Sequence, residues 1–331
     1  MVSRGDPLKA RLAPVWSFLG KHFKRVALVG TVIGIAIALS SQWGAITRFD
    51  WRIAPGVFAL AVLLLAVGPI LQGVSYWLLL RMLGLPSNFS EALLIWMRSF
   101  LVRYAPSGAL VIVIRVRERE RMSATAMDIY TSTAYEQLVA LIAGAVACLA
   151  AFAAAGVWPP TLAIVIAVCV VLVGIAVRPR FFKHWGTCLL DWRGIDPGPL
   201  LRGRQLIAAV VFNLPGWLAT GLGTWLLLRA LSSEEIPGIA WVTGVYAFSW
   251  MVGFLVPLLP GGLGLREATF VALIGKSVGV GPATALSLAL RLTATIGEFV
   301  AIGLVELLYL VRKRSARWRG QLEVRLGRAG L

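Results

Sequence analysis

Residues 257–264 are Pro-Leu-Leu-Pro-Gly-Gly-Leu-Gly, and they interrupt an apolar region that runs from 238 to 278. Proline removes a backbone hydrogen-bond donor and glycine loosens the chain, so one helix should end here and another begin. A second break, Ala105-Pro106-Ser107-Gly108, interrupts the apolar region 86–121. Each arm has about 15–20 residues, which is marginal for crossing a bilayer. The two breaks therefore predict two re-entrant helical hairpins, whose irregular backbone is buried in protein or lines a cavity.

The composition of the whole chain is that of a membrane protein. Hydrophobic residues make up 59% of the 331 positions and charged residues 14%, whereas soluble domains have roughly 45–50% and about 25%. Six apolar runs approach or exceed the roughly 20 residues that a membrane-spanning helix needs. These runs are 26–46, 54–81, 125–153, 160–177, 206–229 and 283–310. We therefore expect an all-α polytopic membrane protein with six full spans plus the two re-entrant hairpins.

Each hairpin belongs to one copy of an internal repeat. Trp77-Leu78-Leu79-Leu80-Arg81 recurs as Trp225-Leu226-Leu227-Leu228-Arg229. Phe100-Leu101-Val102 recurs as Phe254-Leu255-Val256, and Ala124-Thr125-Ala126 recurs as Ala283-Thr284-Ala285. The two units cover about 54–153 and 206–310 of a single transmembrane domain, 26–310. Three predicted spans, an odd number, separate the hairpins, so the second unit should be inverted relative to the first.

Basic residues cluster on one side of this predicted topology. They fill the N-terminal segment 1–25, the loop 178–205 and the tail 311–331, and they include Arg115, Arg117, Arg119 and Arg121 at the mouth of the first hairpin. The opposite loops hold only a few basic residues. The positive-inside rule then predicts that both termini are cytoplasmic. The run 115–121 is interpreted as a topology anchor, and the alternative is that it binds anionic lipid headgroups. Because the net charge of +17 is divided among short segments between apolar runs, we expect no nucleic-acid partner.

Ionisable residues at membrane depth are expensive and usually face a polar cavity. We expect the hairpin tips to meet near the midplane, where guanidinium groups and half-helix N-termini favour a phosphate. The predicted phosphate-binding residues are Arg103, Arg266, Arg291, Gly108, Gly261 and Gly262. Glu136 and Glu267 would hold Arg103 and Arg266 when the site is empty, or carry protons. The alternative interpretation is that these charges only pair as bridges that pin the helices. Glu298 is a further candidate in the second unit, Arg98 is a weaker candidate because it could snorkel, and Glu306 is interpreted as solvated or interfacial.

The sequence contains no pattern typical of an enzyme centre. No nucleophile–base pair, HExxH motif or Asp-rich motif is present. Cys148, Cys169 and Cys188 lack metal-ligand spacing, and His22 and His184 are the two histidines. We therefore expect no catalytic residue, metal or cofactor.

The segment Pro260-Gly261-Gly262-Leu263-Gly264-Leu265-Arg266-Glu267 resembles the Pro-Gly-Gly-x-Gly-x-Arg-Glu motif of the lysylphosphatidylglycerol synthase transmembrane (flippase-like) family. Arg291-Leu292 is similar to that family's Arg-Leu, and Tyr104–Gly108 with the later Glu136 is similar to its first motif. Ser107 and Gln137 depart from the family pattern, which favours Gly and Arg there. The resemblance covers roughly residues 15–315.

This resemblance implies a domain of the bacterial inner membrane that moves lipids between leaflets. In bifunctional members the lipid is an aminoacylated phosphatidylglycerol made by a soluble C-terminal domain. The chain ends soon after its last predicted span, so we expect no such domain here, and any lipid-modifying enzyme would be a separate partner.

Inverted repeats with broken helices are typical of alternating-access transporters. We therefore predict a lipid translocase, a flippase or scramblase, rather than an enzyme. It would move an anionic phospholipid or lipid-linked phosphate through a cavity between the hairpins. The alternatives are a membrane-embedded transferase or accessory subunit acting on lipid-linked sugars, and a small-anion or drug transporter.

Overall fold

The computed structural model describes residues 40, 43–100, 109–157, 200–254, 262 and 264–328, and every regular element among them is helical. Four of these helices have a stretch long and apolar enough to cross a membrane. They are α3 (Pro55–Met82), α6 (Ala126–Ala154), α9 (Gly203–Leu231) and α12 (Val280–Arg328). They confirm the spans predicted at 54–81, 125–153, 206–229 and 283–310 as apolar helices. The predicted span 160–177, and all but the last few residues of 26–46, lie outside the described residues.

Shorter helices flank the two predicted breaks. The first break lies between α4 (Phe89–Phe100) and α5 (Ala109–Arg117), and the second between α10 (Ile239–Phe254) and α11 (Leu265–Val278). A short helix, α2 (Trp43–Thr47), precedes α3, and the 3-10 helix η2 (Arg119–Met122) follows α5. The order long, short, short, long therefore occurs twice, as α3 to α6 and as α9 to α12.

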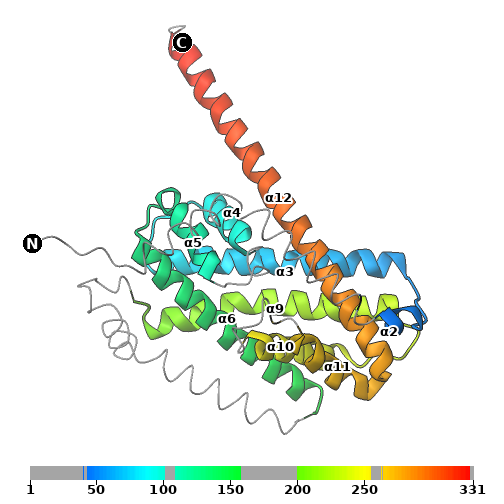
Figure 1. Ribbon diagram of the computed structural model, residues 1–331. Coiled ribbons are helices and arrows are strands. Elements are labelled where there is room, and N and C mark those ends of the chain that lie inside the picture. The colour runs from blue at the N-terminus through cyan, green and yellow to red at the C-terminus, as the bar shows by residue number, and fades with distance from the viewer. Residues whose placement is uncertain are drawn as a thin grey trace, which may run out of the picture.

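The central helices α3 and α9 lie side by side and run in opposite directions (Figure 1). The Arg52 N–H donates to the Leu231 carbonyl (3.2 Å), which joins the start of α3 to the end of α9. At the other end, Gln205 Nε2 donates to the Met82 carbonyl (2.9 Å). The outer contacts occur in matching pairs, since α6 packs on α10 and α9 while α12 packs on α4 and α3. The last long helix of each half therefore packs against the other half.

Local contacts also recur between the halves. The ring N–H of Trp77 donates to a backbone carbonyl in the following loop (3.2 Å), and the Arg81 guanidinium lies 5.3 Å from the ring centroid. Trp225 makes the corresponding hydrogen bond (3.1 Å), and Arg229 lies 4.9 Å from its ring centroid. Tryptophan with a polar edge and an apolar face is suited to a helix end at a membrane–water interface. The two copies of the repeated Trp-Leu-Leu-Leu-Arg segment therefore make the same local contacts.

Two glycines allow α3 and α9 to touch at their crossing. A Cβ atom on Gly68 would lie 2.2 Å from Thr220 Oγ1 and 3.3 Å from the Gly216 carbonyl oxygen. A Cβ atom on Gly216 would lie 2.8 Å from Gln72 Cγ and 3.2 Å from the Gly68 carbonyl oxygen. Small residues at helix crossings in membranes let backbones approach closely, and the van der Waals contact so gained replaces the missing hydrophobic driving force.

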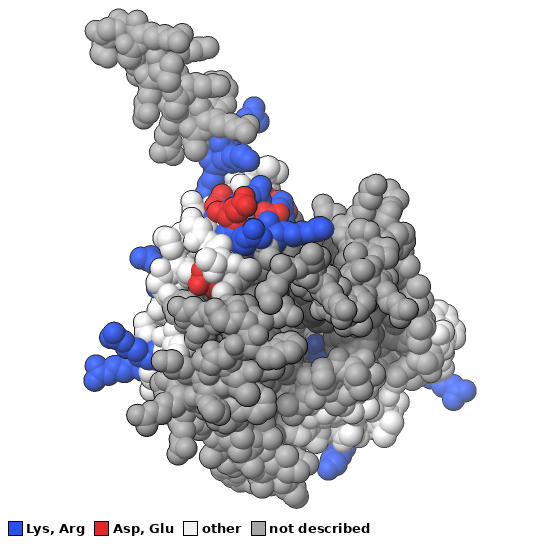
Figure 2. Space-filling model, turned by 60° about the vertical axis from the view of Figure 1, so that its left-hand side comes forward, with Lys and Arg blue, Asp and Glu red and all other residues white. Residues whose placement is uncertain are grey.

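The last helix extends well beyond the other elements. Its segment Val280–Arg314 has 35 residues and contains the apolar stretch that makes α12 a candidate membrane span. At 1.5 Å per residue this part is about 50 Å long, which exceeds the roughly 30 Å of a hydrocarbon core. The helix then continues to Arg328 and projects from the body of the molecule (Figure 1). Acidic and basic side chains are mixed at the base of this projection, so the visible face is not purely cationic (Figure 2).

The glycine crossing yields a stability prediction. Gly68→Ala should destabilise the protein by about 1–3 kcal/mol, the usual cost of overpacking, because the new methyl group meets Thr220. Gly56→Ala, also in α3, adds the same methyl group where no atom lies within 4 Å, so it should be neutral or slightly stabilising. Thermal unfolding of the purified variants in detergent measures the difference. An equal effect of both changes would contradict this account of the crossing.

Candidate functional site

The first half holds a buried arginine–glutamate pair between α5 and α6. Arg115 is 2% exposed, and its guanidinium donates to both oxygens of Glu136. Trp96 Nε1 donates to the same carboxylate (2.6 Å), and Arg115 Nε donates to Ser99 Oγ (2.9 Å). The ring of Tyr76 covers the guanidinium, with its centroid 4.5 Å from Cζ. A charge in a low-dielectric interior requires such complete pairing, so this arginine is held on several sides.

The position of Arg115 corrects the interpretation of the run 115–121. We expected Arg115 to serve as a topology anchor at the cytoplasmic mouth of the first hairpin, but it is buried among α4, α5 and α6. Arg117, two residues later, is exposed. Residues two apart lie on opposite faces of a helix, so alternate arginines in one helical segment cannot share an environment. The spacing of the arginines at every second residue was therefore the sequence feature that could have indicated that Arg115 and Arg117 differ in burial.

The second half holds a corresponding pair between α11 and α12. Arg291 NH1 lies 3.0 Å from Glu267 Oε1, and the two side chains are 11% and 17% exposed. The other oxygen of Glu267 accepts a hydrogen bond from the Gly264 N–H (2.7 Å). The carboxylate therefore caps the first turn of α11 and neutralises Arg291 at the same time.

The glycines of the second break explain how this carboxylate is positioned. Gly262 and Gly264 have φ angles of +70° and +85°, in the region that favours glycine. A Cβ atom on Gly262 would lie 2.8 Å from the Gly253 Cα atom of α10. The spacing Gly-x-Gly-x-Arg-Glu thus turns the chain sharply against α10 and places Glu267 within the first turn of α11.

The acidic and basic residues occupy opposite helices in the two pairs. In the first half the base is on the short helix and the acid is on the long helix, and in the second half the reverse holds. Glu136 and Arg291 lie ten and eleven positions beyond the first residues of α6 and α12. At 1.5 Å per residue, both lie roughly 15 Å along their helices, about half of a 30 Å hydrocarbon core.

Two other arginines have partners that the sequence did not indicate. The guanidinium of Arg266 lies 5.0 Å from the ring centroid of Tyr246 on α10, while Glu267, its predicted partner, holds Arg291 instead. Arg98 of α4 forms a two-point pair with Glu306 of α12, with distances of 2.6 Å and 3.0 Å. Glu306 therefore joins the two halves through a pair whose side chains are 39% and 31% exposed.

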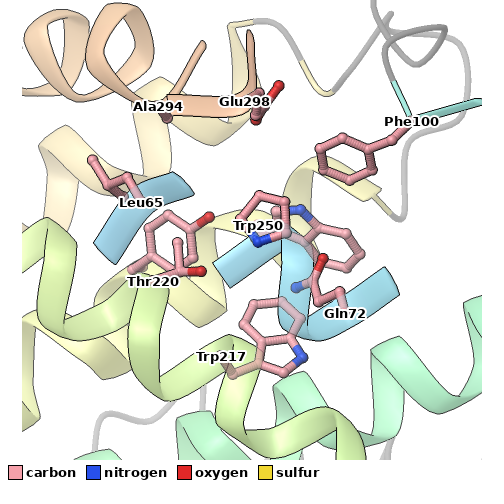
Figure 3. Close-up of a pocket in the computed structure, with 10 residues that line it drawn as sticks. Leu65, Gln72, Phe100, Trp217, Thr220, Trp250, Ala294 and Glu298 are labelled. Carbon is pink, nitrogen blue, oxygen red and sulfur yellow. The ribbon is translucent and has the colours of Figure 1, made fainter. Parts of the chain in front are cut away.

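A pocket lies between the halves (Figure 3). Glu298 and Phe100 lie above Trp250 and Trp217 in this view, and Gln72 faces the same space. Glu298, at the middle of the apolar part of α12, is only 3% exposed. The lining comes from five helices and comprises Leu65, Pro69, Gln72, Phe100, Trp217, Thr220, Tyr246, Trp250, Ala294 and Glu298.

Several predicted site residues lie outside the described residues. These are Arg103, Gly108 and Gly261, so their places relative to the pocket stay predictions. Gly262 is described, and it packs against α10. Within the described ranges, no group of three or more His, Cys, Asp or Glu side chains forms a metal-ligand cluster.

The profile of the family described as lysylphosphatidylglycerol synthase TM region matches residues 25–319. A comparison with curated proteins finds no match.

The buried pair in the first half yields a second prediction. Glu136→Gln leaves the Arg115 charge buried without its counter-ion, which should destabilise the protein by about 3–5 kcal/mol. The matched control is Glu118→Gln, because Glu118 pairs with Arg121 at the surface, where such pairs contribute about 0–1 kcal/mol. Thermal unfolding in detergent compares the two. If Glu136→Gln proves as mild as Glu118→Gln, Arg115 does not depend on this partner.

Proposed function

The chain belongs to the lysylphosphatidylglycerol synthase TM region family, and we propose that it is a lipid translocase of the bacterial inner membrane. The substrate is an anionic phospholipid or a lipid-linked phosphate. Its headgroup passes through the pocket between the two halves, while its apolar tails stay in the bilayer. The protein acts as a transporter and catalyses no covalent reaction on the lipid.

The observation that carries this proposal is that each half has one arginine–glutamate contact at a similar distance along its long helix. The Arg115–Glu136 contact is buried, and the Arg291–Glu267 contact is half-buried. Charged groups inside a membrane are expensive, and they are retained mainly where they face a substrate or ion path. Arg291 lies 3.0 Å from one oxygen of Glu267, and the two side chains are 11% and 17% exposed. A phosphate oxygen accepts hydrogen bonds from the same donors as that carboxylate. Guanidinium groups bind phosphates through two parallel hydrogen bonds.

Arg266 supplies a second positive charge for the headgroup. Its guanidinium stacks on Tyr246, a residue that lines the pocket, and the side chain is half-buried. A cation on an aromatic ring keeps its N–H donors free to turn toward an anion. We propose that Arg266 and Arg291 hold the phosphate in the second half, and that Arg103 with the glycines of the breaks completes the site. Glu136 and Glu267 balance the arginine charges when no lipid is bound.

The architecture supports alternating access. The opposed directions of α3 and α9, and the matched contacts of α6 and α12, are what two inverted units would produce. In this proposal the four short helices form two re-entrant hairpins within a six-span protein whose termini are both cytoplasmic. The pocket opens to one leaflet and then to the other as one unit rocks against its partner.

Leaflet exchange in liposomes tests the proposal. The purified protein is reconstituted with a panel of headgroup-labelled anionic lipids, and exchange is followed by quenching the outer label. Arg266→Gln and Arg291→Gln should each slow the exchange of the preferred lipid at least about tenfold, since loss of one charge-assisted contact costs about 1.5–3 kcal/mol.

Arg229→Gln is the matched control. Arg229 also lies over an aromatic ring, but it is exposed at the end of α9, so exchange should continue at the wild-type rate. If wild-type protein moves none of the lipids, with and without an imposed proton gradient, the translocase proposal fails. The transferase or accessory role would then be the better explanation.

A further inference from the structure

We infer that the indole N–H of Trp250 binds a phosphate oxygen of the headgroup together with Arg266. This inference rests on the proposed function and adds a binding residue to its site. Trp250 belongs to α10, lines the pocket between the halves, and lies between Phe100 and Trp217 in the view of Figure 3. An indole N–H is a donor without acceptor capacity, so it is suited to an anion and not to a cation.

Trp250 is part of a short sequence pattern that occurs in both halves. The pattern Trp-Met-x-x-Phe begins at Trp96 on α4 and at Trp250 on α10. In each copy its phenylalanine is the last residue of the helix before a break. The tryptophan and phenylalanine rings are stacked in both copies, with centroids 4.7 Å and 5.1 Å apart. The two tryptophans therefore hold equivalent positions on the arms that precede the breaks.

In the first half, this tryptophan and an arginine bind one carboxylate. Trp96 Nε1 and the Arg115 guanidinium both donate hydrogen bonds to Glu136 of α6. Arg115 also lies over the ring of Tyr76 and donates to Ser99, the residue before the phenylalanine of the pattern. The first half thus shows an indole N–H and a guanidinium that share a single anionic group through charge-assisted hydrogen bonds.

Arg266 has the corresponding place in the second half. A Cβ atom on Gly253, the counterpart of Ser99, would lie 3.1 Å from Arg266 Cβ. The guanidinium of the same arginine lies 5.0 Å from the ring centroid of Tyr246. Tyr246, Trp250 and Gly253 are spaced four and three residues apart, so they share one face of α10. The Arg266 side chain therefore runs along the helix face that carries Trp250.

The carboxylate of the first cluster has no acidic counterpart in the second. Arg291 occupies the place along α12 that Glu136 occupies along α6. In the part of the chain that the structure describes, no residue forms a hydrogen bond or ion pair with Trp250 Nε1 or with the Arg266 guanidinium. Both side chains are half-buried beside the pocket, whereas their counterparts in the first half are buried. A phosphate oxygen of the substrate would take the role that the Glu136 carboxylate has in the first half.

Binding to the purified protein in detergent tests the inference. Calorimetry measures the affinity for a short-chain phospholipid, dihexanoylphosphatidylglycerol, and for inorganic phosphate. Trp250→Phe keeps an aromatic ring next to Phe254 but lacks the N–H donor, so it should weaken phospholipid binding at least about tenfold. Inorganic phosphate should bind more weakly than the phospholipid. If it binds equally tightly, the site takes a free anion and the assignment to a headgroup is wrong.

Trp241→Phe is the matched control on the same helix. Among the described residues its N–H is buried without a hydrogen-bond partner, and Trp241 does not line the pocket, so phospholipid affinity should equal that of the wild type. Thermal unfolding without ligand separates binding from folding. Trp96→Phe removes a bond to a buried carboxylate and should lower the melting temperature, whereas Trp250→Phe loses no hydrogen bond in the free protein and should not.

Nuclear magnetic resonance of protein isotope-labelled at its indole nitrogens is independent of transport. The signal of Trp250, identified by its loss in Trp250→Phe, should move downfield when the phospholipid is added, because a hydrogen bond to an anion deshields the indole proton. The Trp241 signal should not move. If the Trp250 signal does not move, or if Trp250→Phe and Trp241→Phe bind the phospholipid equally well, the inference is wrong.

Leaflet exchange distinguishes a failure of this inference from a failure of the translocase proposal. Wild-type exchange whose rate is unchanged in Trp250→Phe would overturn the inference and leave the proposal intact. Phospholipid binding that depends on Trp250, in a protein that moves no lipid, would contradict the translocase proposal and support the binding site.

Discussion

A charge inside a membrane must be neutralised by another charge, and this requirement determines how the short helices are held. The Arg115–Glu136 pair joins α5 to α6, and the Glu267–Arg291 pair joins α11 to α12. Each short helix that follows a break is therefore tied to the long helix after it. Without these contacts, the segments after the breaks would have only van der Waals packing to fix them, because lipid competes equally for their apolar faces.

The two halves depend on each other through the central crossing. Glycines at 68 and 216 bring α3 and α9 into backbone contact, and the last helix of each half packs on the opposite half. The Arg98–Glu306 pair adds a charged contact across the same boundary. The pocket is formed by helices of both halves, so it exists only when the halves are assembled, and a movement of one half against the other must change its shape.

The sequence predicted the helices better than it predicted their contacts. Long apolar runs and the Pro-Gly breaks act locally, so α3, α6, α9 and α12 appear where they were expected, and the short helices end on either side of the breaks. Pairing partners are tertiary, so Glu136 and Glu267 were expected to hold Arg103 and Arg266, although they contact Arg115 and Arg291. Arg115 belongs to a run of mostly charged residues, 115–121, whose composition is typical of an exposed segment. The pocket combines residues from five helices, and no local pattern indicates which side chains of distant helices will meet.

The continuity of α12 connects the pocket mechanically to the end of the helix that projects from the body of the molecule. Arg291, Glu298 and Glu306 lie on one helix that runs without interruption to Arg328. A helix of this length bends only gently unless a proline or a bulge kinks it. A small tilt of α12 beside the pocket therefore produces a larger displacement at its far end. Whatever holds that tip, whether a protein or the headgroup layer, would apply torque to the centre of the molecule.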